Sequence, residues 1–233
     1  LTGEIVGWLN ADDVYESDAV QIAVKTLREN PKVDLVCSDL GIIDESGAVV
    51  GTSRSDHFDL VRLLSDNMIK QPTVFMRRRV IDELGGVDSK RHYVMDQELW
   101  LRAGLVGMEF KYLAGEILAS FRICAGTKTF EASEEFCQEW RSVLISLAPN
   151  ALIPQASIDK AIQTNSISIH MAALRKAQSA KDYKGLLYAW WKLIRSRPTL
   201  SWNPGIARAF ISGLLSKRVD RLGKFRKNSI ADS

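Results

Sequence analysis

Segments with the apolar pattern of buried strands alternate with segments of helical periodicity from residue 4 to about residue 123. Strands are expected at 4–9, 33–38 (continuing to 43), 73–76, 110–113 and 117–123. Helices are expected between them, at 17–30, 58–64, 77–84 and 96–107. This alternation is typical of α/β domains, in which helices cover the faces of a central sheet. It therefore predicts an α/β fold for the first part of the chain.

The pattern changes after Thr129, where only helical periodicity remains. Helices are expected at 136–147, 156–178, 183–197 and 205–222. We therefore expect two parts, an α/β domain at residues 1–128 and an all-helical extension at residues 129–233.

The helical extension combines tryptophans with a basic stretch. Trp190, Trp191 and Trp202 are followed by six basic residues and a single acid between Lys217 and Lys227. Such a segment is predicted to make peripheral contact with an anionic membrane. The alternative is a helical cap on the first domain with a frayed basic end.

Composition excludes several classes of protein. Cys37, Cys124 and Cys137 are widely spaced, which fits reduced thiols better than a disulfide framework or a zinc site. The apolar runs are far shorter than the ~20 residues that span a bilayer, and no signal peptide is expected. The formal net charge is only +3, and no nucleic-acid partner is expected. We expect a cytoplasmic protein, with the inner face of the plasma membrane as its location if the basic stretch binds lipid.

Two adjacent carboxylates, Asp12 and Asp13, follow the first expected strand in "WLNADD". In open α/β sheets, ligands collect at the carboxyl ends of the strands. Two acids in a tight turn can hold a hard divalent cation through oxygen. An ordinary turn is the alternative, because Asn and Asp side chains bond to nearby backbone. The residues alone leave both interpretations open.

A second polar group lies in "GGVDSKRHYVMDQELWLRAG", where a glycine-rich loop leads into a helix that opens at Asp96. Asp96 is interpreted either as an N-cap or as a general base held at a loop–helix junction. The helical spacing of Trp100 with Leu99 and Ala103 places it in the core.

Taken together, "WLNADD" and the later "GGVD…YVMDQELWLR" resemble the family 2 glycosyltransferases of the GT-A fold. The resemblance covers Gly3 to about Lys128, roughly the second half of that family's catalytic domain. It implies a GT-A-like, Rossmann-related mixed sheet with flanking helices, followed by a helical extension that the family does not explain. The nucleoside-binding first half of the family has no counterpart here, so we expect this segment alone to be inactive.

The resemblance also implies roles for particular residues. In that family an Asp-x-Asp-like element holds Mg²⁺ or Mn²⁺ against the diphosphate of a nucleotide-sugar. Asn10, Asp12 and Asp13 occupy its place, with a neutral Asn instead of the first acid. The family's base lies in a Glu-Asp pair, of which only Asp96 is present. The implied reaction is an inverting transfer to the hydroxyl of a saccharide or lipid-linked saccharide, in cell-surface or extracellular polysaccharide assembly.

Further side chains are expected to contact the donor or the acceptor, although structural roles explain them as well: Trp8, Gln71, His92, Glu98, Arg122 and Lys128. Two other functions stay open. A nucleotidyltransferase also uses strand-end acids, but it needs a glycine-rich phosphate loop, which the sequence lacks. A truncated, non-catalytic relative that acts as an interaction module through its helical part is the other alternative.

Overall fold

The structure is a computed structural model that describes residues 2–124 and 132–196. The described residues divide into two compact units, one of residues 2–124 with 142–161 and one of residues 132–141 with 162–196. The expected boundary at 128–129, the expected helix at 205–222 and the basic stretch at 217–227 lie outside the described residues. None of the described helices has the length and apolar character that crossing a membrane requires.

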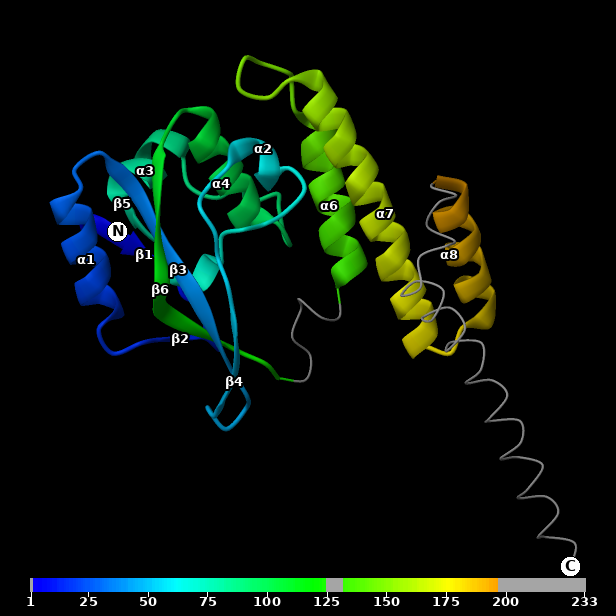
Figure 1. Cartoon of the computed structure of the whole chain (residues 1–233), viewed down its shortest axis with the longest axis horizontal. Coiled ribbons are helices and arrows are strands. Elements are labelled where there is room, and N and C mark those ends of the chain that lie inside the picture. Colours follow the sequence, from blue (N-terminus) through cyan, green and yellow to red (C-terminus); the bar gives the residue numbers. More distant parts are fainter. Residues whose placement is uncertain (1, 125–131, 197–233) are drawn as a thin grey trace, which may run out of the picture. The chain divides into compact units, whose positions relative to one another are not determined.

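A six-stranded mixed sheet forms the centre of the first unit and confirms the expected mixed α/β fold (Figure 1). Its strands are β1 (Ile5–Gly7), β2 (Val14–Tyr15), β3 (Val33–Ile43), β4 (Val49–Ser53), β5 (Phe75–Arg77) and β6 (Glu109–Arg122). The order across the sheet is β1-β5-β3-β6-β2, and β4 pairs with the second half of β3.

The strand directions bring three carboxyl ends to one edge of the sheet. β3 lies parallel to β6 and antiparallel to β5, and β5 lies antiparallel to β1. β1, β3 and β6 therefore run in the same direction. Because β5 runs the other way, its amino end lies at the edge where β1 ends. Residues before β5 and residues after β1 are thus neighbours.

Helices cover both faces of the sheet, and Figure 1 shows α1 and α4 on opposite sides of β3 and β6. The helices up to residue 124 are α1 (Ala19–Glu29), α2 (Leu60–Leu63), the 3₁₀ helix η1 (Gln71–Thr73), α3 (Arg78–Leu84) and α4 (Met95–Leu105). The buried side of α1 packs on Val36 and Leu118. On the other face, the rings of Phe110 and Phe58 stack with their centroids 3.9 Å apart. The ring of Trp100 is perpendicular to that of Phe110, with the centroids 6.5 Å apart.

β6 is one strand of 14 residues, whereas the sequence indicated two strands at 110–113 and 117–123. Leu113 of β6 lies opposite Ser38 of β3, but the next residue of β3, Asp39, lies opposite Ile117. Residues 114–116 therefore form a bulge, in which Gly115 takes φ +81°. Because a bulge absorbs extra residues without reversing the chain, the glycine marks an irregularity within a strand and not its end.

Three helices follow: α6 (Ser133–Ser146), α7 (Gln155–Ser179) and α8 (Tyr183–Ser196). Within the second unit, α8 packs on α7 through Leu186 and Ala189, which contact Leu174 and Ala177. Cys37, Cys124 and Cys137 are not joined to one another by disulfides.

Replacing Thr73 by Val is expected to lower the free energy of unfolding by about 1–3 kcal/mol. The buried Thr73 hydroxyl accepts the N–H of Ser38 at 3.2 Å, and it lies 3.1 and 2.8 Å from the carbonyls of Ser38 and Lys70. Val keeps the shape but leaves the buried N–H without its acceptor. Urea titration measures the loss. Thr73→Ser, which keeps the hydroxyl, should lose clearly less; equal losses would show that the hydroxyl does not hold η1 to β3.

Candidate active site

The turn after β1 is held by hydrogen bonds among its own residues. The N–H of Asp13 donates to the carbonyl of Asn10 at 3.3 Å, and the Asn10 amide donates to Asp13 Oδ2 at 3.0 Å. Asp13 is buried, whereas Asn10 and Asp12 are exposed. Asp13 therefore stabilises the turn from within, and Asp12 is the acid that is exposed to solvent.

Arg122, the last residue of β6, fastens this turn to the sheet. Its N–H donates to Asp13 Oδ1 at 3.3 Å, and its Nε donates to the carbonyl of Asp12 at 3.1 Å. Its Nη1 lies 3.0 and 3.3 Å from the carbonyls of Asp44 and Glu45. Burial raises the pKa of Asp13, and the bonds from Arg122 and Asn10 oppose that rise. The guanidinium thus holds the backbone of the turn and adds positive charge beside it.

Gln71 connects the same turn to η1. Its Oε1 accepts the Asn10 amide at 3.1 Å, and its Nε2 donates to the carbonyl of Trp8 at 2.5 Å. The two segments meet because Gly7 pairs with Phe75, which places the end of β1 beside the start of β5. Gln71 is buried, and these two bonds give both the oxygen and the nitrogen of its side-chain amide a hydrogen-bond partner.

Asp96 lies in the first turn of α4, whose N-cap residue is Val94. The interpretation of Asp96 as the N-cap is therefore wrong. Burial raises the pKa of the Asp96 carboxyl group, and hydrogen bonds from the N–H groups of Gln97 and Asp96 and from the Asn67 side chain oppose the rise. A carboxylate with a raised pKa is a better proton acceptor near neutral pH than an exposed one.

One short segment, residues 67–71, contacts both acidic groups. The Asn67 side chain lies close enough to the Asp96 carboxyl group to lower its pKa, and the side chain of Gln71 bonds to Asn10. Lys70 Nζ donates to the carbonyl of Asn67 at 3.2 Å, within the segment. Since four residues of fully extended chain span at most about 14 Å, the turn after β1 and the start of α4 belong to one region of the first unit.

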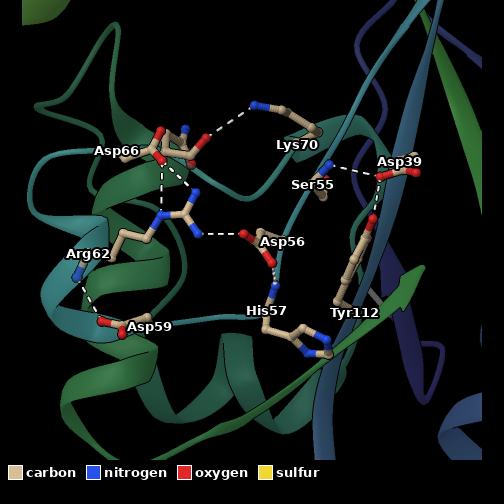
Figure 2. Close-up of polar contacts among 10 residues, drawn as sticks. Asp39, Ser55, Asp56, His57, Asp59, Arg62, Asp66, Lys70 and Tyr112 are labelled. Atoms are coloured by element: carbon tan, nitrogen blue, oxygen red, sulfur yellow. Dashed lines mark hydrogen bonds and ion pairs between the residues drawn. The ribbon is translucent and has the colours of Figure 1, made fainter. Parts of the chain in front are cut away.

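A polar cluster that the sequence analysis missed lies near Lys70 (Figure 2). The buried Asp39 carboxylate in β3 accepts the Tyr112 hydroxyl at 2.6 Å and the N–H of Ser55 at 2.9 Å. The bond to Asp39 raises the pKa of Tyr112 to about 12, which keeps its hydroxyl protonated. The sequence signal for this cluster was the Ser-Asp pair that interrupts an apolar strand in "VCSDLGII".

Arg62 of α2 organises the exposed side of the cluster in Figure 2. Its guanidinium bonds to Asp56 at 2.5 Å and to Asp66 at 2.8 Å, and its N–H bonds to Asp59 at 2.8 Å. Asp66 directly precedes Asn67, so these ion pairs help to position the segment 67–71. Their contribution to stability is small because the side chains are exposed.

Glu98, a predicted substrate contact, is paired within α4. Its two carboxylate oxygens accept the Arg102 guanidinium, each at 2.8 Å. Arg102 also donates to the carbonyls of Leu84 and Gly86 at 2.6 and 2.7 Å. The pair therefore fastens α4 to the end of α3.

The other predicted contact residues lie in different surroundings. Trp8 is half-buried and contributes the carbonyl that Gln71 binds. His92 is exposed, with its ring edge-on to Tyr93 at 5.0 Å. Lys128 lies outside the described residues. Of the predicted residues, the structure thus joins Trp8, Asn10, Asp12, Asp13, Gln71 and Arg122 in one bonded group.

The turn fits a Mg²⁺ or Mn²⁺ ion that takes few ligands from protein. In the part of the chain that the structure describes, no group of three or more His, Cys, Asp or Glu is arranged to hold a metal. Exposed Asp12 and Asn10 offer a carboxylate and an amide oxygen, which suit hard cations. Magnesium is commonly bound by one or two carboxylates together with substrate phosphates. The donor set therefore suits a hard divalent cation that takes most of its ligands from outside the protein.

No protein-family model matches the chain, and no curated protein matches it. Among solved structures, it is similar to S. aureus TarS 1–349 in complex with UDP, at 14% identity and a TM-score of 0.48 over 88% of this chain and 68% of that chain. It is also similar to the mannosyltransferase PcManGT from Pyrobaculum calidifontis in complex with GDP-Man and Mn²⁺. There the identity is 15% and the TM-score 0.49, over 94% of this chain and 64% of that chain. This chain thus spans about two thirds of the length of each.

Proposed function

We propose that this chain forms the catalytic part of an inverting glycosyltransferase, which moves a sugar from a nucleotide-sugar to a hydroxyl acceptor. The observation that carries the proposal is that one short segment, residues 67–71, bonds to Asn10 in the turn through Gln71 and places the Asn67 side chain beside Asp96. Single displacement needs a base for the acceptor and a site for the departing diphosphate on opposite sides of one carbon atom. Two acidic groups joined by so short a segment suit this requirement.

Each residue has a defined task in this reaction. Asp96 accepts the proton of the acceptor hydroxyl while that oxygen bonds to the anomeric carbon and the bond from carbon to the diphosphate oxygen breaks. When bound to Asp12 and Asn10, Mg²⁺ or Mn²⁺ supplies positive charge for the departing diphosphate. Asp13, Gln71 and Arg122 keep the turn in place through the bonds described above.

The setting of the reaction is part of the proposal and rests on the sequence resemblance. The acceptor is a saccharide or a lipid-linked saccharide in cell-surface or extracellular polysaccharide assembly. The reaction takes place on the cytoplasmic side, where nucleotide-sugars are the donors. No nucleic acid takes part.

Release of nucleoside diphosphate from a panel of UDP- and GDP-sugars, measured with the full-length gene product, tests the proposal. We expect acceptor-dependent release that EDTA abolishes and Mn²⁺ restores. Asp12→Asn should raise the Mn²⁺ concentration needed for half-maximal release about tenfold or more, because a carboxylate ligand is lost. Asp18→Asn, which changes an exposed acid outside the turn, is the matched control. Absence of release with every donor would favour the non-catalytic module instead.

Asn67→Ala is expected to move the acid limb of the profile of kcat/KM against pH to higher pH. The Asn67 side chain lowers the pKa of Asp96, so its removal raises that pKa further. Since the base must be ionised to accept a proton, activity is then lost at a higher pH as the solution is acidified. Ser65→Ala, an exposed change nearby, should leave the limb in place. An unmoved limb in Asn67→Ala would contradict the role of Asp96 as the base.

A further inference from the structure

Helix α8 presents two faces of different character. Leu186, Ala189 and Leu193 are buried, and the first two pack against α7, beside which α8 lies in Figure 1. The side turned away from α7, which we name the outer face of α8, consists of exposed residues: Lys184, Leu187, Tyr188, Trp191, Lys192 and Arg195. Tyr188 and Lys192 lie at its border, where they also line a pocket with residues of α7 and with Glu134 of α6. Spacings of three and four residues place these side chains on one side of the helix.

The apolar members of the outer face are large and adjacent. Leu187, Tyr188 and Trp191 are exposed by 52%, 58% and 52%, and the two rings stack with centroids 6.3 Å apart. Contiguous exposed apolar side chains of this kind mark interaction sites on soluble domains. The neighbouring Trp190 is half-buried, so only one member of the Trp190-Trp191 pair points outward.

The charged members of the outer face all have the same sign. Lys192 Nζ lies 4.7 Å from the Tyr188 ring centroid, and the Arg195 guanidinium lies 5.2 Å from the Trp191 ring. From Tyr183 to Ser196 the sequence has no Asp or Glu. Asp182, just before the helix, accepts the N–H of Gly185 at 3.0 Å. The face thus joins aromatic rings to positive charge along one helix.

We propose that the outer face of α8 binds the surface of a membrane that contains anionic lipids. Trp and Tyr favour the level of the lipid headgroups, where the ring meets apolar chains and the polar atom meets water. Lys and Arg extend their charged ends to the headgroups, and each adds attraction to anionic lipid. A second copy of the chain is a poorer partner, because a symmetric contact would oppose Lys184, Lys192 and Arg195 to like charges. The proposal does not depend on the transferase reaction.

Flotation of the full chain with phosphatidylcholine vesicles, with and without phosphatidylglycerol, tests this surface. We expect binding only to the anionic vesicles, weakened by added salt. In the triple variant Lys184→Gln, Lys192→Gln and Arg195→Gln, the affinity for anionic vesicles should fall by about tenfold or more. A matched triple variant at exposed Lys25, Arg28 and Lys32 removes the same charge from another part of the chain and should bind normally. Circular dichroism verifies that both variants are folded.

A second variant separates apolar insertion from simple charge attraction. Tyr188→Ser with Trp191→Ser should lower the partition onto anionic vesicles about tenfold, whereas Ile145→Ser, an exposed apolar residue of α6, should leave it unchanged. Three results would overturn the proposal: no flotation with anionic vesicles at low salt, equal losses in the two triple variants, or binding that persists in the α8 triple variant. Self-association that the α8 variant abolishes, without lipid binding, would assign the face to a second copy.

Discussion

Asp96→Asn is expected to lower kcat/KM for sugar transfer about 100-fold or more without unfolding the protein. The amide has the shape of the carboxylate and keeps an oxygen for the N–H groups of Gln97 and Asp96, but it cannot accept the proton of the acceptor hydroxyl. Asp82→Asn, an exposed change on α3, should retain full activity. Transfer at the wild-type rate by Asp96→Asn would remove the proposed base.

The same substitution should raise the melting temperature at neutral pH. Burial raises the pKa of Asp96 in the folded state above its value of about 3.9 in an unfolded chain. Between these two values the folded protein binds more protons than the unfolded one, so the free energy of unfolding falls as pH rises through this window. Above the folded-state pKa the full cost of desolvating the half-buried charge is present. Asn carries no charge, so the variant should be more stable than the wild type at pH 7, and residue 96 should no longer make the free energy of unfolding depend on pH.

Thermal unfolding of both proteins across the acid range measures this effect. The difference in stability should be largest near neutral pH and should shrink as the pH falls below the raised pKa. A variant that melts lower than the wild type at pH 7 would show that the Asp96 charge is well stabilised in the folded protein, which contradicts the raised pKa.

Trp100→Ala is expected to cost about 3–5 kcal/mol of unfolding free energy. Trp100 is completely buried in α4, and its ring is perpendicular to that of Phe110 in β6, with the centroids 6.5 Å apart. Its removal leaves a cavity between α4 and the sheet, directly beneath the helix that carries Asp96. Because the position of the whole helix depends on this contact, turnover should fall in proportion to the fraction of folded protein. The dependence of kcat/KM on pH should stay the same.

Trp100→Phe provides the matched control for that cavity. The indole Nε1 has no hydrogen-bond partner among the described residues, so Phe loses volume but no hydrogen bond. Urea unfolding should therefore show a clearly smaller loss for Phe than for Ala. Equal losses would mean that the indole group contributes something other than packing.

The presence of strands and helices could be predicted from sequence, but the order of the strands could not. Buried strands such as β3 consist mostly of apolar residues, which is a local property. The insertion of β5 between β1 and β3 depends on pairings between distant residues, such as Gly7 with Phe75 and Leu35 with Met76. A local pattern contains no information about such partners.

The site was predictable to a similar degree. A polar run directly after an apolar strand identified Asn10, Asp12 and Asp13, but it could not tell which acid turns inward, because that is decided by Arg122 on a distant strand. The pair of Asp39 and Tyr112 was missed for a related reason. Tyr112 lies opposite Cys37 in the parallel pairing of β3 and β6, and only this register brings its hydroxyl to Asp39.

The nuclear magnetic resonance signals of three side-chain amides test the central claim most directly, namely that the turn after β1 and the start of α4 form one site. Titration with Mn²⁺ and inorganic pyrophosphate should broaden the amide signals of Asn10, Gln71 and Asn67. The amide of Asn30, which precedes β3 at the opposite edge of the sheet, should stay sharp, and Asp12→Asn should weaken the effect. Broadening that reaches Asn10 but spares Asn67, or that appears equally at Asn30, would contradict a shared site.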